Sequence, residues 1–82
     1  MEKLEFKVGD IIVQMGCRTR RMVLDVLNGE YGISHPLRGD SDRDAIMAFD
    51  GGIAGICDRE IEKIYVKVGH WCPELLEYTD EN

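Results

Sequence analysis

The feature that most constrains the fold of this chain is the dipeptide Asn28-Gly29, which lies between two apolar stretches. Asparagine and glycine accept the two positive φ angles of a type I′ turn, the commonest two-residue connection of a β-hairpin. The stretch after the dipeptide, residues 30–35, alternates between polar and apolar side chains as a half-buried strand does. We therefore expect an antiparallel hairpin made of residues 22–27 and 30–35.

The turn also predicts which residues of this hairpin face each other. With Asn28 and Gly29 as the turn, Leu24 lies opposite Ile33, and opposed residues share a face of the sheet. A slip by one residue would bury two acids, so we expect the pairing to be firm. The expected core face consists of Met22, Leu24, Val26, Tyr31, Ile33 and His35.

Further short segments have the composition of strands. Apolar and β-branched side chains are frequent in residues 10–15, 45–49 and 64–68. We expect residues 53–57 to pair with the strand at residues 45–49. Residues 58–62 predict one short helical turn. Short strands with a helical turn before the last one favour a mostly β fold. We expect a small SH3-like, partly open barrel of about five strands.

The composition changes after Gly69. Residues 70–82 contain four acids and no Lys or Arg, and they follow a glycine. We expect one barrel domain at residues 1–69 and an acidic C-terminal tail at residues 70–82, either docked on the barrel or loose in solution. The large side chains of this tail are Trp71, Leu75, Leu76 and Tyr78.

Charge is distributed unevenly along the chain. Residues 1–21 carry five basic and three acidic side chains, whereas residues 22–82 carry five basic and thirteen acidic ones, and the net charge is −6. An acidic surface repels phosphate, so nucleic acid is an unlikely partner, and a basic protein is favoured. No apolar run is long enough to cross a bilayer, and no apolar leader follows Met1. We expect a cytoplasmic protein that does not bind membranes.

No group of residues in the sequence indicates catalysis. We find no nucleophile with an obvious base and no glycine-rich phosphate loop. The three cysteines, Cys17, Cys57 and Cys72, have no regular spacing, and we expect free thiols. The close pair His70 and Cys72 lacks the second pair that a zinc site needs. We therefore expect a protein that is not an enzyme and binds no cofactor and no metal.

The opening segment, Phe-x-Val-Gly-Asp-Ile-Ile-Val followed by Arg-Met-Val, resembles small uncharacterised bacterial and phage proteins with SH3-like or KOW-like barrels. The resemblance covers residues 6–35, with a looser similarity at residues 58–68. It implies binding of proteins, peptides or nucleic acid, and no shared catalytic residues. The matching positions are Phe6, Val8, Gly9, Asp10, Val13, Arg21, Met22 and Val23.

The function we expect is that of a non-catalytic protein-binding module, such as a bacterial or phage accessory or regulatory protein. Two alternatives remain open. An acidic inhibitor would mimic nucleic acid on a nucleic-acid enzyme, and a KOW-like binder would hold nucleic acid through the loop at residues 18–21. The expected partner-binding residues are Arg18, Arg20 and Arg21 in this loop, and Trp71, Leu75, Leu76 and Tyr78 in the tail.

Overall fold

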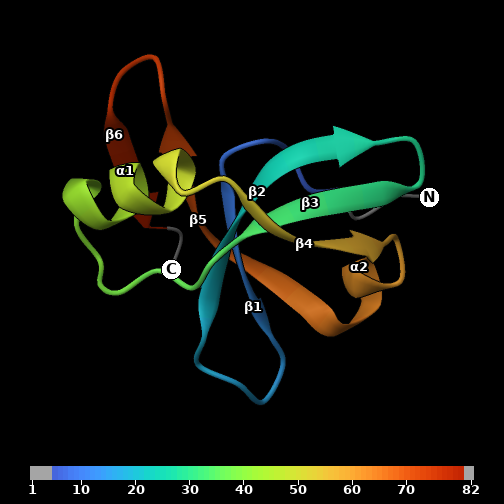
Figure 1. Cartoon of the computed structure of the whole chain (residues 1–82). Coiled ribbons are helices and arrows are strands. Elements are labelled where there is room, and N and C mark those ends of the chain that lie inside the picture. Colours follow the sequence, from blue (N-terminus) through green and yellow to red (C-terminus); the bar gives the residue numbers. More distant parts are fainter. Residues whose placement is uncertain (1–4, 81–82) are drawn as a thin grey trace.

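The computed structural model describes residues 5–80 of the chain. Within this range, six antiparallel strands form one open sheet in the order β4-β3-β2-β1-β5-β6 (Figure 1). The strands are β1 (Asp10–Gln14), β2 (Arg20–Leu27), β3 (Glu30–Ser34), β4 (Ile53–Asp58), β5 (Tyr65–Cys72) and β6 (Glu77–Asp80), and the helices are α1 (Asp42–Asp50) and α2 (Ile61–Ile64). The expectation of a mostly β fold is confirmed, with one strand and one helix more than expected.

The hairpin of β2 and β3 lies where the sequence predicts it, but its turn differs. Gly29 has a φ of 81°, while Asn28 does not adopt a positive φ, so the turn is not of type I′. Leu27 faces Glu30 as predicted. Further along, Leu24 has no partner in β3, and Val23 instead of Leu24 faces Ile33. The extra residue is a β-bulge, which bends the strand and changes the side chains that reach each face.

The bulge corrects part of the expected core face. Tyr31 and Ile33 are buried as predicted. Met22 is buried too, but in a different cluster from these two residues. His35 and Val26 are exposed, contrary to the prediction. The predicted pairing of residues therefore holds near the turn and fails at Leu24, whereas the predicted burial already fails at Val26.

The sheet buries apolar side chains on both of its faces. Successive residues of a strand point to opposite faces, and the neighbours Ile11 and Ile12 are both fully buried. One cluster lies beneath α2 and the segment before β1; it contains Phe6, Ile12, Val23, Tyr31, Ile33 and Ile61. The other cluster lies beneath α1; it contains Ile11, Met22, Leu37, Ala45, Ala48 and Trp71.

Residues 45–49, which we expected to form a strand, belong to helix α1. The hydroxyl of Ser41 accepts a hydrogen bond from the Asp44 N–H, and the Asp44 carboxylate accepts one from the Ser41 N–H. This reciprocal arrangement is a capping box, which starts a helix by satisfying its free N–H groups. The Ser41 hydroxyl also donates to the Asp44 carboxylate at 2.6 Å, and this hydrogen bond, followed by the one from the Ser41 N–H, lowers the pKa of the Asp44 carboxyl. The helical turn expected at residues 58–62 occurs slightly later, as α2.

The C-terminal residues belong to the sheet up to residue 80. β5 continues through Gly69 to Cys72, and β6 pairs with its last four residues. The expected division between a barrel at residues 1–69 and a tail at residues 70–82 therefore falls inside β5. The extreme ends of these two expected units, residues 1–4 and 81–82, lie outside the described residues.

The Val-Gly-Asp turn fixes the start of β1 against the neighbouring strand β5. The Trp71 N–H donates to the Gly9 carbonyl at 2.7 Å. Gly9 has a φ of +99°, and a Cβ at this position would lie 2.3 Å from the Trp71 carbonyl oxygen. Only glycine fits here, both for its conformation and for its lack of a side chain. The Asp10 carboxylate closes the turn by accepting the Lys7 N–H at 2.8 Å.

Replacing Trp71 by Ala tests whether the C-terminal strand pair is part of the core. Trp71 is 1% exposed, so we expect Trp71→Ala to lower the free energy of unfolding by about 3–5 kcal/mol in urea denaturation. Leu75, at 70% exposed, is the control, and Leu75→Ala should change stability by less than about 0.5 kcal/mol. Equal effects of the two changes would contradict the burial of Trp71.

Candidate functional site

The hairpin of β5 and β6 projects from the body of the molecule beside α1 (Figure 1). Its tip carries Leu75 and Leu76, which are 70% and 59% exposed, more than any other large apolar side chain of the described residues. The acids Glu74 and Glu77 flank the two leucines in the sequence. The hairpin tip, residues 73–76, therefore holds an apolar pair in water between two negative charges.

The backbone of the tip is held in an unusual conformation. Leu76 has a φ of 51°, a left-handed conformation that non-glycine residues rarely adopt. Two backbone interactions hold the turn that contains Leu76. The Leu75 N–H donates to the Cys72 carbonyl at 3.2 Å, and Cys72 pairs with Glu77 across the hairpin. Such conformations cost about 1–3 kcal/mol and cluster at functional sites. The turn thus retains a leucine at a position where glycine would be less strained.

The base of this hairpin is fixed firmly to the rest of the fold. Trp71 is buried in the cluster beneath α1. The Tyr78 N–H donates to the Asp42 carboxylate at 2.9 Å, and the Tyr78 hydroxyl accepts from Arg20 at 3.2 Å. Of the four expected binding residues in this region, Leu75 and Leu76 are available to a partner. Trp71 and the half-buried Tyr78 instead hold the hairpin in place.

The three arginines expected to bind a partner have different surroundings. Arg20 and Arg21 lie in β2, not in the preceding loop. The Arg20 guanidinium forms an ion pair with Asp40 at 2.6 Å and also donates to the Gly39 carbonyl. Arg21 donates to the Ser34 carbonyl at 3.1 Å. Arg18 is exposed, and its side chain makes no hydrogen bond or ion pair with residues 5–80. The three therefore do not form one free cationic cluster.

Arg20 and Arg18 should differ in their effect on stability. Arg20→Ala removes two hydrogen bonds that join β2 to β6 and to the loop before α1, and we expect a loss of about 1–3 kcal/mol. The ion pair with the exposed Asp40 should add little to this loss. Arg18→Ala should change the free energy of unfolding by less than about 0.5 kcal/mol. Thermal and urea unfolding of both variants check the prediction, and equal losses would contradict it.

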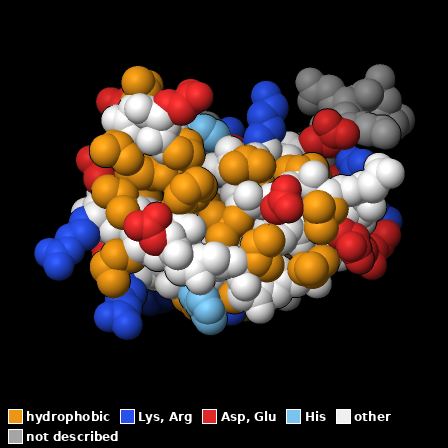
Figure 2. Space-filling view, turned by 45° about the horizontal axis from the view of Figure 1, so that its top comes forward, with side chains coloured by type: hydrophobic (Ala, Val, Ile, Leu, Met, Phe, Trp, Pro, Cys, Tyr) orange, Lys and Arg blue, Asp and Glu red, His pale blue; other side chains and the backbone are white. Residues whose placement is uncertain are grey.

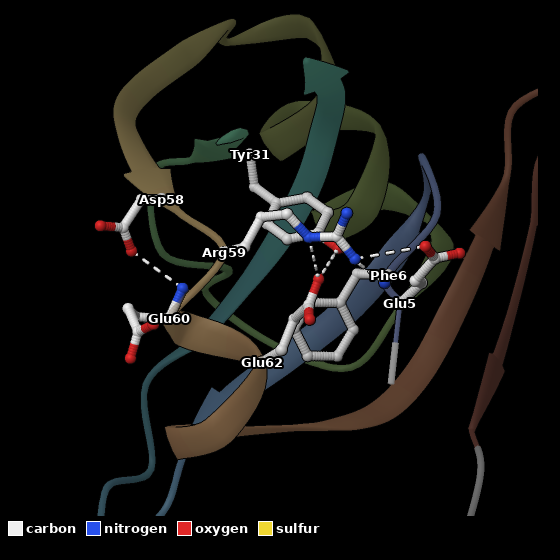
Figure 3. Close-up of polar contacts among 7 residues, drawn as sticks. All are labelled: Glu5, Phe6, Tyr31, Asp58, Arg59, Glu60 and Glu62. Carbon is white, nitrogen blue, oxygen red and sulfur yellow. Dashed lines mark hydrogen bonds and ion pairs between the residues drawn. The ribbon is translucent and has the colours of Figure 1, made fainter. Parts of the chain in front are cut away.

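A network of polar side chains joins β3, α2 and the segment before β1 (Figure 3). The Tyr31 hydroxyl accepts the Phe6 N–H at 3.2 Å and donates to the Glu62 carboxylate at 2.5 Å. Glu62 also accepts from Arg59 at 2.9 Å, and Arg59 reaches Glu5 at 3.2 Å. Sequence reasoning missed this network, because nothing in the spacing of these residues indicates that they meet.

The network has a structural role, as its surroundings show. A hollow of about 90 Å³ beside it is lined by Glu5, Phe6, Val26, Leu27, Tyr31 and Arg59. Small-molecule sites usually enclose about 300–1,000 Å³, so this hollow is too small for one.

The contacts of the network also shift the pKa values of two of its members. Burial, followed by the hydrogen bond to Glu62, raises the pKa of the Tyr31 phenol. The hydrogen bonds to Glu62 and Glu5 raise the pKa of Arg59.

Tyr31→Phe tests this network and its dependence on pH. The change removes the hydrogen bond from the Tyr31 hydroxyl to Glu62 and the one from the Phe6 N–H to this hydroxyl, and we expect a loss of about 1–3 kcal/mol at neutral pH. Because the pKa of Tyr31 is raised on folding, the unfolded chain loses this proton first. The contribution of the Tyr31 proton to the free energy of unfolding should therefore be complete below about pH 10 and should decline as the pH rises further. The measurement is urea unfolding of both proteins from pH 7 to 11; an identical alkaline decline in the variant would contradict the assignment to Tyr31.

A second polar group surrounds the carboxylate of Asp10, which is 2% exposed. Nδ1 of His70 lies 2.8 Å from this carboxylate, and Nζ of Lys67 lies 3.4 Å from it. Within the described part of the chain, His70 forms no hydrogen bond to a hydroxyl or thiol that it could activate. The arrangement therefore joins β1 to β5.

Another hollow, of about 170 Å³, lies beside α1 and is lined by His35, Pro36, Arg38, Asp44, Met47, Ala48 and Gly51. Among residues 5–80, no three His, Cys, Asp or Glu side chains converge as metal ligands would. Neither helix is long and apolar enough to cross a membrane in that range.

The exposed leucine pair of the hairpin tip is therefore the feature that is hardest to explain by folding alone. Comparison with known proteins adds no precedent for it: the sequence matches no family model, and neither the curated proteins nor the solved structures gave a significant match.

Proposed function

We propose that this protein is a binding module that inserts the hairpin tip of β5 and β6 into an apolar pocket of another protein. The observation that carries the proposal is the exposure of Leu75 and Leu76 at the end of a hairpin whose base is fixed by Trp71 and Tyr78. A rigid base lowers the entropy lost on binding. Two adjacent leucines that are desolvated in a pocket supply the apolar contact that anchors an interface.

The charges beside the tip indicate the kind of partner. Glu74 and Glu77 would repel the phosphates of nucleic acid and of anionic membranes. They would be attracted by Lys or Arg around an apolar pocket. The proposal is therefore a protein partner with a basic rim.

The strand order supports the SH3-like interpretation, which we propose as the architecture of residues 10–72. β5 pairs with β1, the strands β1 to β4 follow one another in the sheet, and the short helix α2 directly precedes β5. Helix α1 and strand β6 would then be additions to this plan. A shared fold does not define a function, so the binding role rests on the hairpin tip.

The two alternative functions receive less support. A nucleic-acid binder using the arginines would have to release Arg20 and Arg21 from their contacts within the fold. A mimic of nucleic acid needs most acids in one continuous surface, whereas Figure 2 shows acidic side chains in separate groups on the face that it draws. This distribution is typical of side chains that keep a protein in solution.

A comparison of two baits tests the proposed function. The full chain and a Leu75→Ser, Leu76→Ser double variant are used to capture proteins from the organism that encodes the chain, with quantitative mass spectrometry. Loss of two anchoring leucines should cost a few kcal/mol of binding energy, so we expect at least one protein to be captured tenfold less by the variant.

The control for this experiment is Met15→Ser, which removes a large apolar side chain that is 57% exposed and lies far along the chain from the hairpin tip. It should leave the capture unchanged. Circular dichroism of all three baits confirms that they are folded. If the double variant captures the same proteins in the same amounts, the hairpin tip is not the binding site.

A further inference from the structure

β4 is an open edge of the sheet. It pairs with β3 on one side and has no strand on its other side. Its backbone makes no hydrogen bond to any described segment besides its partner strand. Natural proteins usually protect such edges with charges or proline, because unpaired N–H and C=O groups attract another strand. The opposite edge, β6, is only four residues long and has an acid at each end. β4 contains neither proline nor a charge until Asp58.

The side chains along this edge are apolar and uncovered. Ile53 and Ile56 are both exposed, Ile56 by 57%. The Ile53 side chain lies over Gly32 of β3, and its Cδ1 is 2.8 Å from the position that a Cβ on Gly32 would take. A Cβ added to Gly55 would meet no atom within 4 Å, so the space beside this glycine is open. After the bulge at Ala54, the strand therefore offers a regular, accessible edge with an apolar face beside it.

The strands that form this edge carry acids and no basic residue. No Lys or Arg occurs in residues 22–37 or in residues 44–58, the segments that contain β3, β4 and most of β2 and α1. Glu30 is paired with Asp58, and both share a face of the sheet with Ile56. On the face of the molecule that Figure 2 draws, apolar side chains gather with acids among them, and Lys and Arg lie toward the margins. The nearest arginine in the sequence, Arg59, is turned toward Glu62 and Glu5 (Figure 3).

We propose that the β4 edge binds an extended segment of a partner protein that is rich in apolar and basic residues and adds to the sheet as a seventh strand. Main-chain hydrogen bonds to β4 would supply affinity, and the side chains beside it would supply specificity. The acids around Ile56 favour Lys and Arg in that segment. A second copy of this chain is disfavoured, since it would bring the same acids together. This surface is separate from the hairpin tip and does not depend on it.

The test uses a displayed library of random 12-residue peptides, selected on the full chain, followed by NMR titration with the best synthetic peptide. We expect the enriched peptides to contain apolar residues together with Lys or Arg, and to lack Asp, Glu and Pro. Shift changes and slower amide exchange should occur along β4. Ile56→Lys should weaken binding at least tenfold, whereas Met15→Lys, a matched change at an equally exposed residue (57%), should change it by less than twofold.

Two further variants make the outcome unambiguous. Glu30→Lys removes a negative charge without touching the apolar residues; it should weaken binding at least threefold, and it replaces Ile56→Lys if that variant does not fold. The Leu75→Ser, Leu76→Ser variant should bind the peptide normally, which separates this surface from the hairpin tip. The proposal is overturned if selection yields no basic, apolar peptides, if the peptide shifts other residues than β4, or if the edge instead forms a dimer of this chain.

Discussion

The constraint on which this structure depends is that a single sheet must bury both of its faces with a short chain. A domain of this size covers only about 60% of the surface it exposes when unfolded. Extra residues in three strands, Leu24, Ala54 and Val68, bend the sheet. Residues such as Ile11 and Ile12 can then both be buried, one on each face. The helices α1 and α2 cover parts of the sheet, whereas the outer edge of β4 and the tip of the β5–β6 hairpin remain uncovered. Both proposed binding surfaces lie at these two places.

The sequence predicted the parts of the fold that local chemistry determines. The turn at Asn28-Gly29 placed the hairpin and its first residue pairs correctly. The pairing failed at Leu24, because a bulge depends on packing between strands that are distant in the sequence. The strand expected at residues 45–49 was wrong for a different reason. A local signal, Ser41 followed three residues later by Asp44, was present and would have predicted the helix.

The residues expected to bind a partner have different exposures in the structure. Leu75 and Leu76 are exposed, and their role in binding stays a prediction. Trp71 has the same apolar character, yet it is buried, because the pairing of β5 with β1 places it beneath α1. The sequence likewise does not distinguish Arg18 from Arg20. Their surroundings differ because Tyr78 and Asp40 contact the Arg20 guanidinium in the folded chain. The open edge of β4 follows from strand order, which the sequence alone does not give.

The use of the basic side chains explains why both uncovered surfaces are acidic. Arg20, Arg21 and Arg59 are engaged in contacts that join elements of the fold, where the planar guanidinium can donate in several directions. Among the described residues, the acids on the hairpin tip and beside β4 form no ion pair with Lys or Arg and remain in water. They add their part of the net charge of −6 beside the exposed apolar side chains. A partner that buries those side chains must also neutralise the acids beside them, so its association should become slower as salt screens the attraction.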